Sequence, residues 1–99
     1  PWITSTEEVT NVDSLQLTTR INGQIRQNSS TKNMFIKVPS IVSKLSKIMT
    51  LEKGDIIATG TPEGVALNNP DTSFLKDGDQ IVMEIEKLGK IQNTVKFVA

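Results

Sequence analysis

The chain has 99 residues, enough for one small domain, and its 36% hydrophobic and 22% charged residues indicate a globular rather than a disordered chain. Eleven basic residues balance eleven acidic ones, so charge gives no argument for binding nucleic acid. The absence of cysteine and histidine excludes a disulfide framework, a thiolate nucleophile and a histidine metal ligand supplied by this chain.

A β-hairpin is the first element that the sequence predicts. Apolar and polar residues alternate over residues 15–21, which is the pattern of a half-buried strand. Asn22-Gly23 follows, a pair that tolerates the positive φ angles of a type I′ turn. The return strand is expected over residues 24–27, and the polar stretch 28–33 is expected to be a loop.

A helix of roughly three turns is expected over residues 39–49. Apolar side chains recur there at helical spacing, which predicts one buried stripe; they stand at positions 41, 42, 45, 48 and 49. Pro39 suits the first turn of a helix, where its missing N–H is not needed.

Two similar segments follow, at residues 51–58 and 75–82, and both read Leu-x-x-Gly-Asp-x-Ile. Each predicts a tight turn at its glycine, Gly54 or Gly78, leading into an apolar strand. The final segment predicts a strand, a turn at Leu88-Gly89 and another strand, and residues 66–73 are expected to form a polar loop. About five or six strands with one helix favour a predominantly β member of the α+β class.

The segment from Gly54 to Val65 is the best candidate for a site. Its glycine spacing fits neither a Walker loop nor a dinucleotide fingerprint. One interpretation is an ordinary turn, with glycine at positive φ and Pro62 fixing the chain after it. The other is a strand end that binds an anion, where Gly60 admits a ligand close to the backbone and a threonine hydroxyl binds a carboxylate or enolate oxygen.

Other polar groups have weaker claims. Glu84 and Glu86 share one strand face and could hold a divalent cation, but a solvated strand face explains them better. The aspartates at 55, 77 and 79 adjoin turn glycines, where capping of the turn accounts for them. Trp2, the only tryptophan, is expected to fill a core or an interface.

Four segments together resemble the fumarylacetoacetate hydrolase family. They are MTLEKGDIIATGTPEGV (49–65), INGQIRQNSSTKNM (21–34), FLKDGDQIVMEIEKLGKIQN (74–93) and the opening PWI. They stand in the family's order and cover essentially the whole chain. Ala66 stands where the family often has another glycine, so the loop that follows need not share the family's shape.

The resemblance implies a mixed β-sandwich roll in a Mg²⁺- or Mn²⁺-dependent homodimer that acts on a 2-oxo or β-diketo acid. The reaction would be acylpyruvate-type C–C hydrolysis, oxaloacetate decarboxylation or 2-hydroxymuconate-type isomerisation, in catabolism. Position for position, the substrate's carboxylate or oxo end would lie at Gly60 and Thr61, with Thr59 as second choice and Gln27 lining the same region.

The family's metal-binding carboxylates and its active-site lysine precede the PWI segment, so the metal ligands are expected outside this chain. Residues 1–99 are therefore expected to be a C-terminal fragment of one catalytic domain, inactive without the N-terminal part of the same protein. No apolar run approaches the about 20 residues that cross a bilayer, and a cytoplasmic location without membrane association is expected. The alternative is a non-catalytic β-rich module that binds a partner through a sheet edge.

Overall fold

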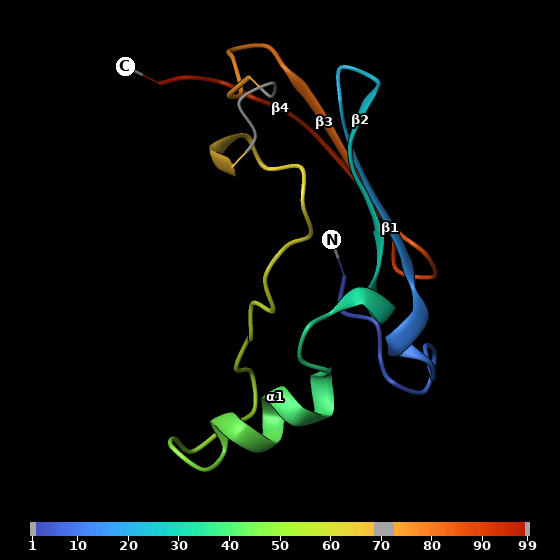
Figure 1. The fold of residues 1–99 in the computed structure, drawn as a ribbon, viewed down its shortest axis with the longest axis vertical. Helices are drawn as coiled ribbons and strands as arrows, with labels where there is room; N and C mark the ends of the chain where they lie inside the picture. The colour runs from blue at the N-terminus through green and yellow to red at the C-terminus, as the bar shows by residue number, and fades with distance from the viewer. Residues whose placement is uncertain (1, 69–72, 99) are drawn as a thin grey trace.

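A four-stranded antiparallel sheet with one short helix is the architecture of the chain (Figure 1). The structure is a computed structural model that describes residues 2–68 and 73–98. The strands are hydrogen-bonded in the order β2-β1-β3-β4. Their bounds are β1 (Gln16–Ile21), β2 (Gln24–Ser30), β3 (Gln80–Ile85) and β4 (Gly89–Thr94), and the helix is α1 (Val38–Leu45). The prediction of a predominantly β member of the α+β class is confirmed.

The hairpin of β1 and β2 forms around the predicted turn. Asn22 and Gly23 have φ angles of 50° and 81°, the positive values that a type I′ turn requires. β2 is longer than predicted, because the register of the hairpin keeps residues 28–30 paired with β1. The loop predicted over residues 28–33 is therefore wrong for its first half, and its second half is a turn of 3₁₀ helix, η2 (Thr31–Asn33).

β3 and β4 form the second hairpin, and β3 also pairs with β1. The chain reverses over residues 86–88, where Lys87 has a φ of 63°, so the turn lies one residue before the predicted position. The strand predicted within residues 51–58 is absent, and Ile56 is 92% exposed. The described residues thus contain four strands rather than five or six, because residues 51–58 have no neighbouring strand with which to pair.

The polar loop predicted over residues 66–73 is described only at its two ends. It begins with a turn of 3₁₀ helix, η3 (Ala66–Asn68), and its residues 69–72 lie outside those that the structure describes. A further 3₁₀ turn, η1 (Val12–Ser14), precedes β1.

The two Gly-Asp turns have the same geometry, as their similar sequences predict. Gly54 and Gly78 have φ angles of 97° and 85°. The carboxylate of Asp55 accepts a hydrogen bond from the N–H of Glu52 at 2.8 Å, and that of Asp79 accepts one from the N–H of Lys76 at 2.8 Å. Asp77 likewise accepts a hydrogen bond from a backbone N–H, that of Phe97, at 2.6 Å. The prediction that these aspartates cap turns is confirmed for Asp55 and Asp79, whereas Asp77 binds the backbone of a segment 20 residues further along the chain.

The helix is shorter and more exposed than predicted. It begins at Val38 and ends at Leu45, after which residues 46–48 form a turn. Pro39 lies in its first turn, as expected. None of its apolar residues is buried; Val42 is 42% exposed, and Ile48 beyond the helix end is 81% exposed. The predicted stripe is therefore only partly covered: Ile41 and Leu45 are half-buried, and the other three positions are exposed.

Little of the chain forms a core. Val9 and Leu15, each 4% exposed, are the buried apolar residues among those described. The accessible surface is 8124 Å², whereas a folded monomer of 10.9 kDa has about 5,600 Å². The radius of gyration is 15.7 Å, against about 13 Å for a compact domain of this length. The chain therefore presents apolar surface that it does not cover itself.

The two faces of the sheet differ in character. Cross-strand pairing aligns Gln27, Thr19, Met83 and Ile91 in one row on the inner face. The next row, Asn28, Thr18, Glu84 and Lys90, lies on the outer, polar face. Figure 1 shows the segment that follows α1 (yellow) running back beside one face of the sheet. Gln27 hydrogen-bonds to this segment, which identifies the inner face.

Candidate functional site

The Thr-Gly-Thr-Pro segment lies outside every helix and strand. Thr59, Gly60 and Thr61 are all exposed. Gly60 has a φ of 92°, and a side chain added there would meet no atom within 4 Å. Both interpretations of this segment thus have a basis in its geometry, because the glycine is needed for the backbone conformation and the space above it is open.

A chain of side-chain hydrogen bonds joins this segment to the sheet. The Thr19 hydroxyl on β1 donates to Oε1 of Gln27 on β2 at 2.9 Å. Nε2 of Gln27 donates to Oγ1 of Thr61 at 2.8 Å and to the carbonyl oxygen of Pro62 at 2.9 Å. The structure therefore brings together Gln27 and Thr61, two of the predicted site residues, although 34 residues separate them. Thr19, Gln27 and Thr61 together form a polar relay.

A β-bulge lies next to Gln27 in β2. Thr19 pairs with Gln27 and Arg20 pairs with Ile25, so Arg26 is an extra residue on β2. Such a bulge bends its strand locally. Gln27 itself keeps its regular pairing with Thr19, which places both side chains on the inner face. Arg26 itself donates through Nη2 to the carbonyl oxygen of Ser73 at 3.3 Å.

Gly64 anchors the same segment on the bulge. Its φ is 108°, and a Cβ atom there would overlap the carbonyl oxygen of Arg26 and lie 3.1 Å from Cγ of Gln27. The backbone of Gly64 thus lies directly against β2, beside the polar relay. This packing role of Gly64 was not predicted from the sequence, where the available signal was a second glycine four residues after Gly60.

An apolar hollow of about 280 Å³ lies on the inner face, at the end of the sheet formed by the β3–β4 turn. Its lining includes Trp2, Met83, Ile85, Leu88 and Ile91. The ring of Trp2 lies against Gly89, where a Cβ atom would be 2.9 Å from it. Trp2 remains 68% exposed, so it does not fill a core of this chain; an interface role stays a prediction.

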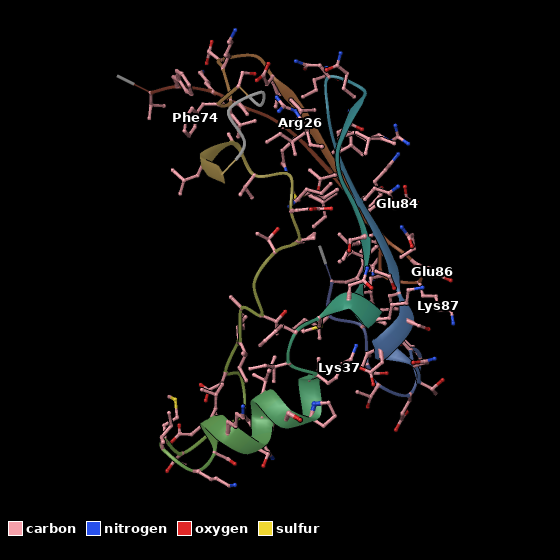
Figure 2. The ribbon with its side chains drawn as sticks, viewed as in Figure 1. Arg26, Lys37, Phe74, Glu84, Glu86 and Lys87 are labelled. Carbon is pink, nitrogen blue, oxygen red and sulfur yellow. The ribbon has the colours of Figure 1, made fainter. Side chains whose placement is uncertain are left out.

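Glu84 and Glu86 do not form a metal site. Glu84 lies on the outer face, and Glu86 follows β3 and accepts a hydrogen bond from the N–H of Gln16 at 3.1 Å. Figure 2 shows both side chains on the outer side of the sheet, away from the Thr61 segment. Among the described residues, no group of three or more Asp or Glu side chains could hold a metal ion. The described part of the chain therefore offers no ligand set for a divalent cation by itself.

Asp79 links the two hairpins. Its Oδ1 accepts a hydrogen bond from Nδ2 of Asn22 at 2.8 Å, and Oδ1 of Asn22 accepts one from the N–H of Gln80 at 2.9 Å. The N–H of Lys76 and then the amide of Asn22 lower the pKa of Asp79 from its ordinary 3.8, because they stabilise the carboxylate. This network holds the Asn22-Gly23 turn against the start of β3.

Comparison with known proteins places the chain in one family. Residues 1–96 match the family described as "Fumarylacetoacetate (FAA) hydrolase C-terminal". Over 95 residues, 96% of this chain, it is 39% identical to an oxaloacetate tautomerase of Bacillus subtilis. Over the same length it is 39% identical to a bifunctional isomerase/decarboxylase of 4-hydroxyphenylacetate degradation from Salmonella dublin.

A solved structure with a similar fold is the maleylpyruvate hydrolase of Sphingobium sp. SYK-6 in complex with manganese(II) and pyruvate. Its TM-score is 0.86, with 35% identity over 96% of this chain. The chain spans only part of each of these proteins: 32% of the tautomerase, 20% of the bifunctional enzyme and 33% of the hydrolase. Within the described residues, no helix is long and apolar enough to span a membrane.

Proposed function

The chain belongs to the fumarylacetoacetate hydrolase family, whose members include hydrolases, isomerases and decarboxylases. From this membership we propose that the chain forms part of an enzyme acting on a 2-oxo or β-diketo acid. The observation that carries the proposal is the contact between Gln27 and Thr61, because it fixes the Thr-Gly-Thr segment over the inner face of the sheet. The three reactions of the relatives, hydrolysis, decarboxylation and isomerisation, remain the candidates.

Residues 1–99 are proposed to be the C-terminal part of a larger catalytic domain. Support comes from the share of each relative that the chain spans, about a third or less. It comes also from the accessible surface, which exceeds that of a compact chain by roughly 2,500 Å². An excess of that size is comparable to the surface area that a large protein–protein interface buries. The rest of the same protein, together with a second subunit of a homodimer, is proposed to cover this exposed surface. The cytoplasm is the proposed compartment.

Thr61 and Gly60 are proposed to bind the carboxylate or oxo end of the substrate, with Thr59 as second choice. A hydroxyl supplies one hydrogen-bond donor to a charged oxygen, which contributes about 1.5–3 kcal/mol. Gly60 leaves open space above the backbone, so a ligand can approach it closely. This chain's contribution to the reaction would thus be to orient the substrate.

A divalent metal is proposed for the full-length enzyme, with its ligands outside this chain. Support comes from the manganese in the related hydrolase, and Mg²⁺ and Mn²⁺ both remain candidates. When bound, such an ion would polarise the carbonyl group of the substrate.

The proposal is tested with the full-length protein, Mn²⁺ and three assays: oxaloacetate tautomerisation, oxaloacetate decarboxylation and hydrolysis of an acylpyruvate. Thr61→Val is expected to lower kcat/KM by about 10-fold or more, as one lost hydrogen bond to a charged group would. Turnover in none of the three assays would refute the enzyme proposal. Unchanged kinetics for Thr61→Val would remove Thr61 from the site.

A non-catalytic interaction module is the second candidate. The exposed apolar surface favours binding to another protein surface, and β2 and β4 each have one edge without a neighbouring strand in the described sheet. The same assays decide between the two, because a binding module would show no turnover in any of the three assays.

A further inference from the structure

The amide of Gln27 has one possible orientation. The carbonyl oxygen of Pro62 can only accept a hydrogen bond, and it lies 2.9 Å from one end of the amide. That end must therefore be the NH₂ group. The other end, Oε1, faces the Thr19 hydroxyl at 2.9 Å, and the hydroxyl donates to it. The carbonyl oxygen of Pro62 thus decides how the amide lies, and the Thr19 hydroxyl, which can donate or accept, is consistent with it.

The orientation of the amide decides what the Thr61 hydroxyl can do. Nε2 of Gln27 has two hydrogens, and it uses one for Pro62 and the other for Oγ1 of Thr61 at 2.8 Å. Oγ1 is then an acceptor toward Gln27, so the single hydrogen of the hydroxyl must point elsewhere. The hydrogen bond from Gln27 therefore leaves the donor of Thr61 available to a group on its other side.

We propose that Thr19 and Gln27 are positioning residues that hold the Thr61 hydroxyl as a hydrogen-bond donor, so that this end of the site selects an acceptor oxygen such as that of a carboxylate or an enolate. The inference rests on the proposed function, because it specifies how Thr61 would meet the substrate. It also changes the predicted role of Gln27. Both hydrogens of its amide are used within the chain, so Gln27 acts through Thr61 instead of donating to the substrate.

The competing explanation is that the polar relay only holds the segment in place. The Thr61 segment has a second attachment at Gly64, which lies against the carbonyl group of Arg26 independently of the relay. Changing the chemistry of residue 27 without changing its size should therefore leave the segment in place. A substitution that retains the fold but reverses the direction of the hydrogen bond separates the two explanations.

Gln27→Glu is that substitution. A glutamate carboxylate has the size of the amide and still accepts from Thr19, but it has no hydrogen to donate, so the bond to the carbonyl oxygen of Pro62 is lost as well and Gly64 must hold the segment. Thr61 would then donate to the new carboxylate and lose its donor toward the substrate. Gln16→Glu is the matched control: Nε2 of Gln16 donates to Oδ1 of Asn28 at 2.7 Å, in a similar exposed cross-strand pair on the outer face. Gln27→Met, which is neutral, is the second test variant.

The experiment measures the dissociation constant of pyruvate and the kcat and KM for oxaloacetate, with the Mn²⁺-loaded full-length protein. Gln27→Glu is expected to weaken pyruvate binding and raise KM by about 10-fold or more, while Gln16→Glu changes neither by more than about 2-fold. Both variants should melt within a few degrees of the parent protein. Gln27→Met is expected to lie between them, because its Thr61 hydroxyl is free to rotate.

A double-mutant cycle with Thr61→Val completes the test. If the relay acts through Thr61, adding Gln27→Glu to Thr61→Val causes no further loss beyond about 2-fold. An equal loss in both backgrounds would show that the new charge at position 27 repels the substrate directly, and would overturn the inference. Equal changes in the pyruvate dissociation constant and in KM for Gln27→Glu and Gln16→Glu would also overturn the inference. If Thr61→Val alone changes neither pyruvate binding nor the kinetic constants, the proposed role of Thr61 is refuted instead.

Discussion

Gly64 offers the sharpest test of how the Thr61 segment is held. Gly64→Ala places a methyl group into the carbonyl oxygen of Arg26, at a φ of 108° that non-glycine residues avoid. The backbone strain costs about 1–2 kcal/mol, and relieving the overlap costs about 1–3 kcal/mol more. Arg26 is the unpaired bulge residue, but its neighbours Ile25 and Gln27 are paired with β1, which limits how far its carbonyl group can shift. We therefore expect the Thr61 segment, and not the strand, to move.

Gly54→Ala is the matched control, because Gly54 has a φ of 97° and open space around it. Urea unfolding of the full-length protein should show a loss of about 1–2 kcal/mol for the control and about 2–5 kcal/mol for Gly64→Ala. The catalytic assays should show a loss of kcat/KM for Gly64→Ala alone, since only this change displaces Thr61. Equal losses of stability and activity for the two variants would refute the steric reasoning.

The remaining predictions concern Asp79 and the metal. The folded-state pKa of Asp79 is lowered, so its contribution to stability is complete above its ordinary pKa of 3.8 and is lost as the pH falls through the lower folded value. Asp79→Asn should therefore lower stability at neutral pH and make the decline of the urea midpoint below pH 3.8 less steep; a parallel decline would contradict this. Removing divalent cations from the full-length enzyme with a chelator should abolish turnover and Mn²⁺ should restore it, whereas turnover that survives exhaustive chelation would rule out the metal.

The sequence predicts well those features that depend on neighbouring residues. The turn at Asn22-Gly23 forms because both residues tolerate positive φ, and no distant contact is needed to specify it. The turns at Gly54 and Gly78 form because an aspartate next to the glycine caps the chain three residues earlier. The alternation over residues 15–21 likewise places β1 within one residue of its observed start.

Features that depend on distant partners could not be predicted in this way. Residues 51–58 have the composition of a strand, but a strand needs a neighbour, and none of the described residues pairs with them. Residues 28–30 have the composition of a loop, yet the hairpin register extends β2 through them. The resemblance to a family placed Gln27 and Thr61 in one region, but the direction of their hydrogen bond required the carbonyl group of Pro62.

The irregular backbone of the Thr61 segment itself has a physical reason. On a strand, the direction of a side chain is set by the pleat, and its backbone groups are used in the ladder. On the Thr61 segment, the direction is set by two contacts with β2: the amide of Gln27 and the close approach of Gly64. The Gly64 contact is with the carbonyl group of Arg26, the extra residue of the bulge, whereas Gln27 keeps its regular pairing with Thr19. A deletion of Arg26 that restored regular pairing would therefore remove the contact of Gly64 and leave Gln27 opposite Thr19, although Arg26 is not among the residues predicted to touch the substrate.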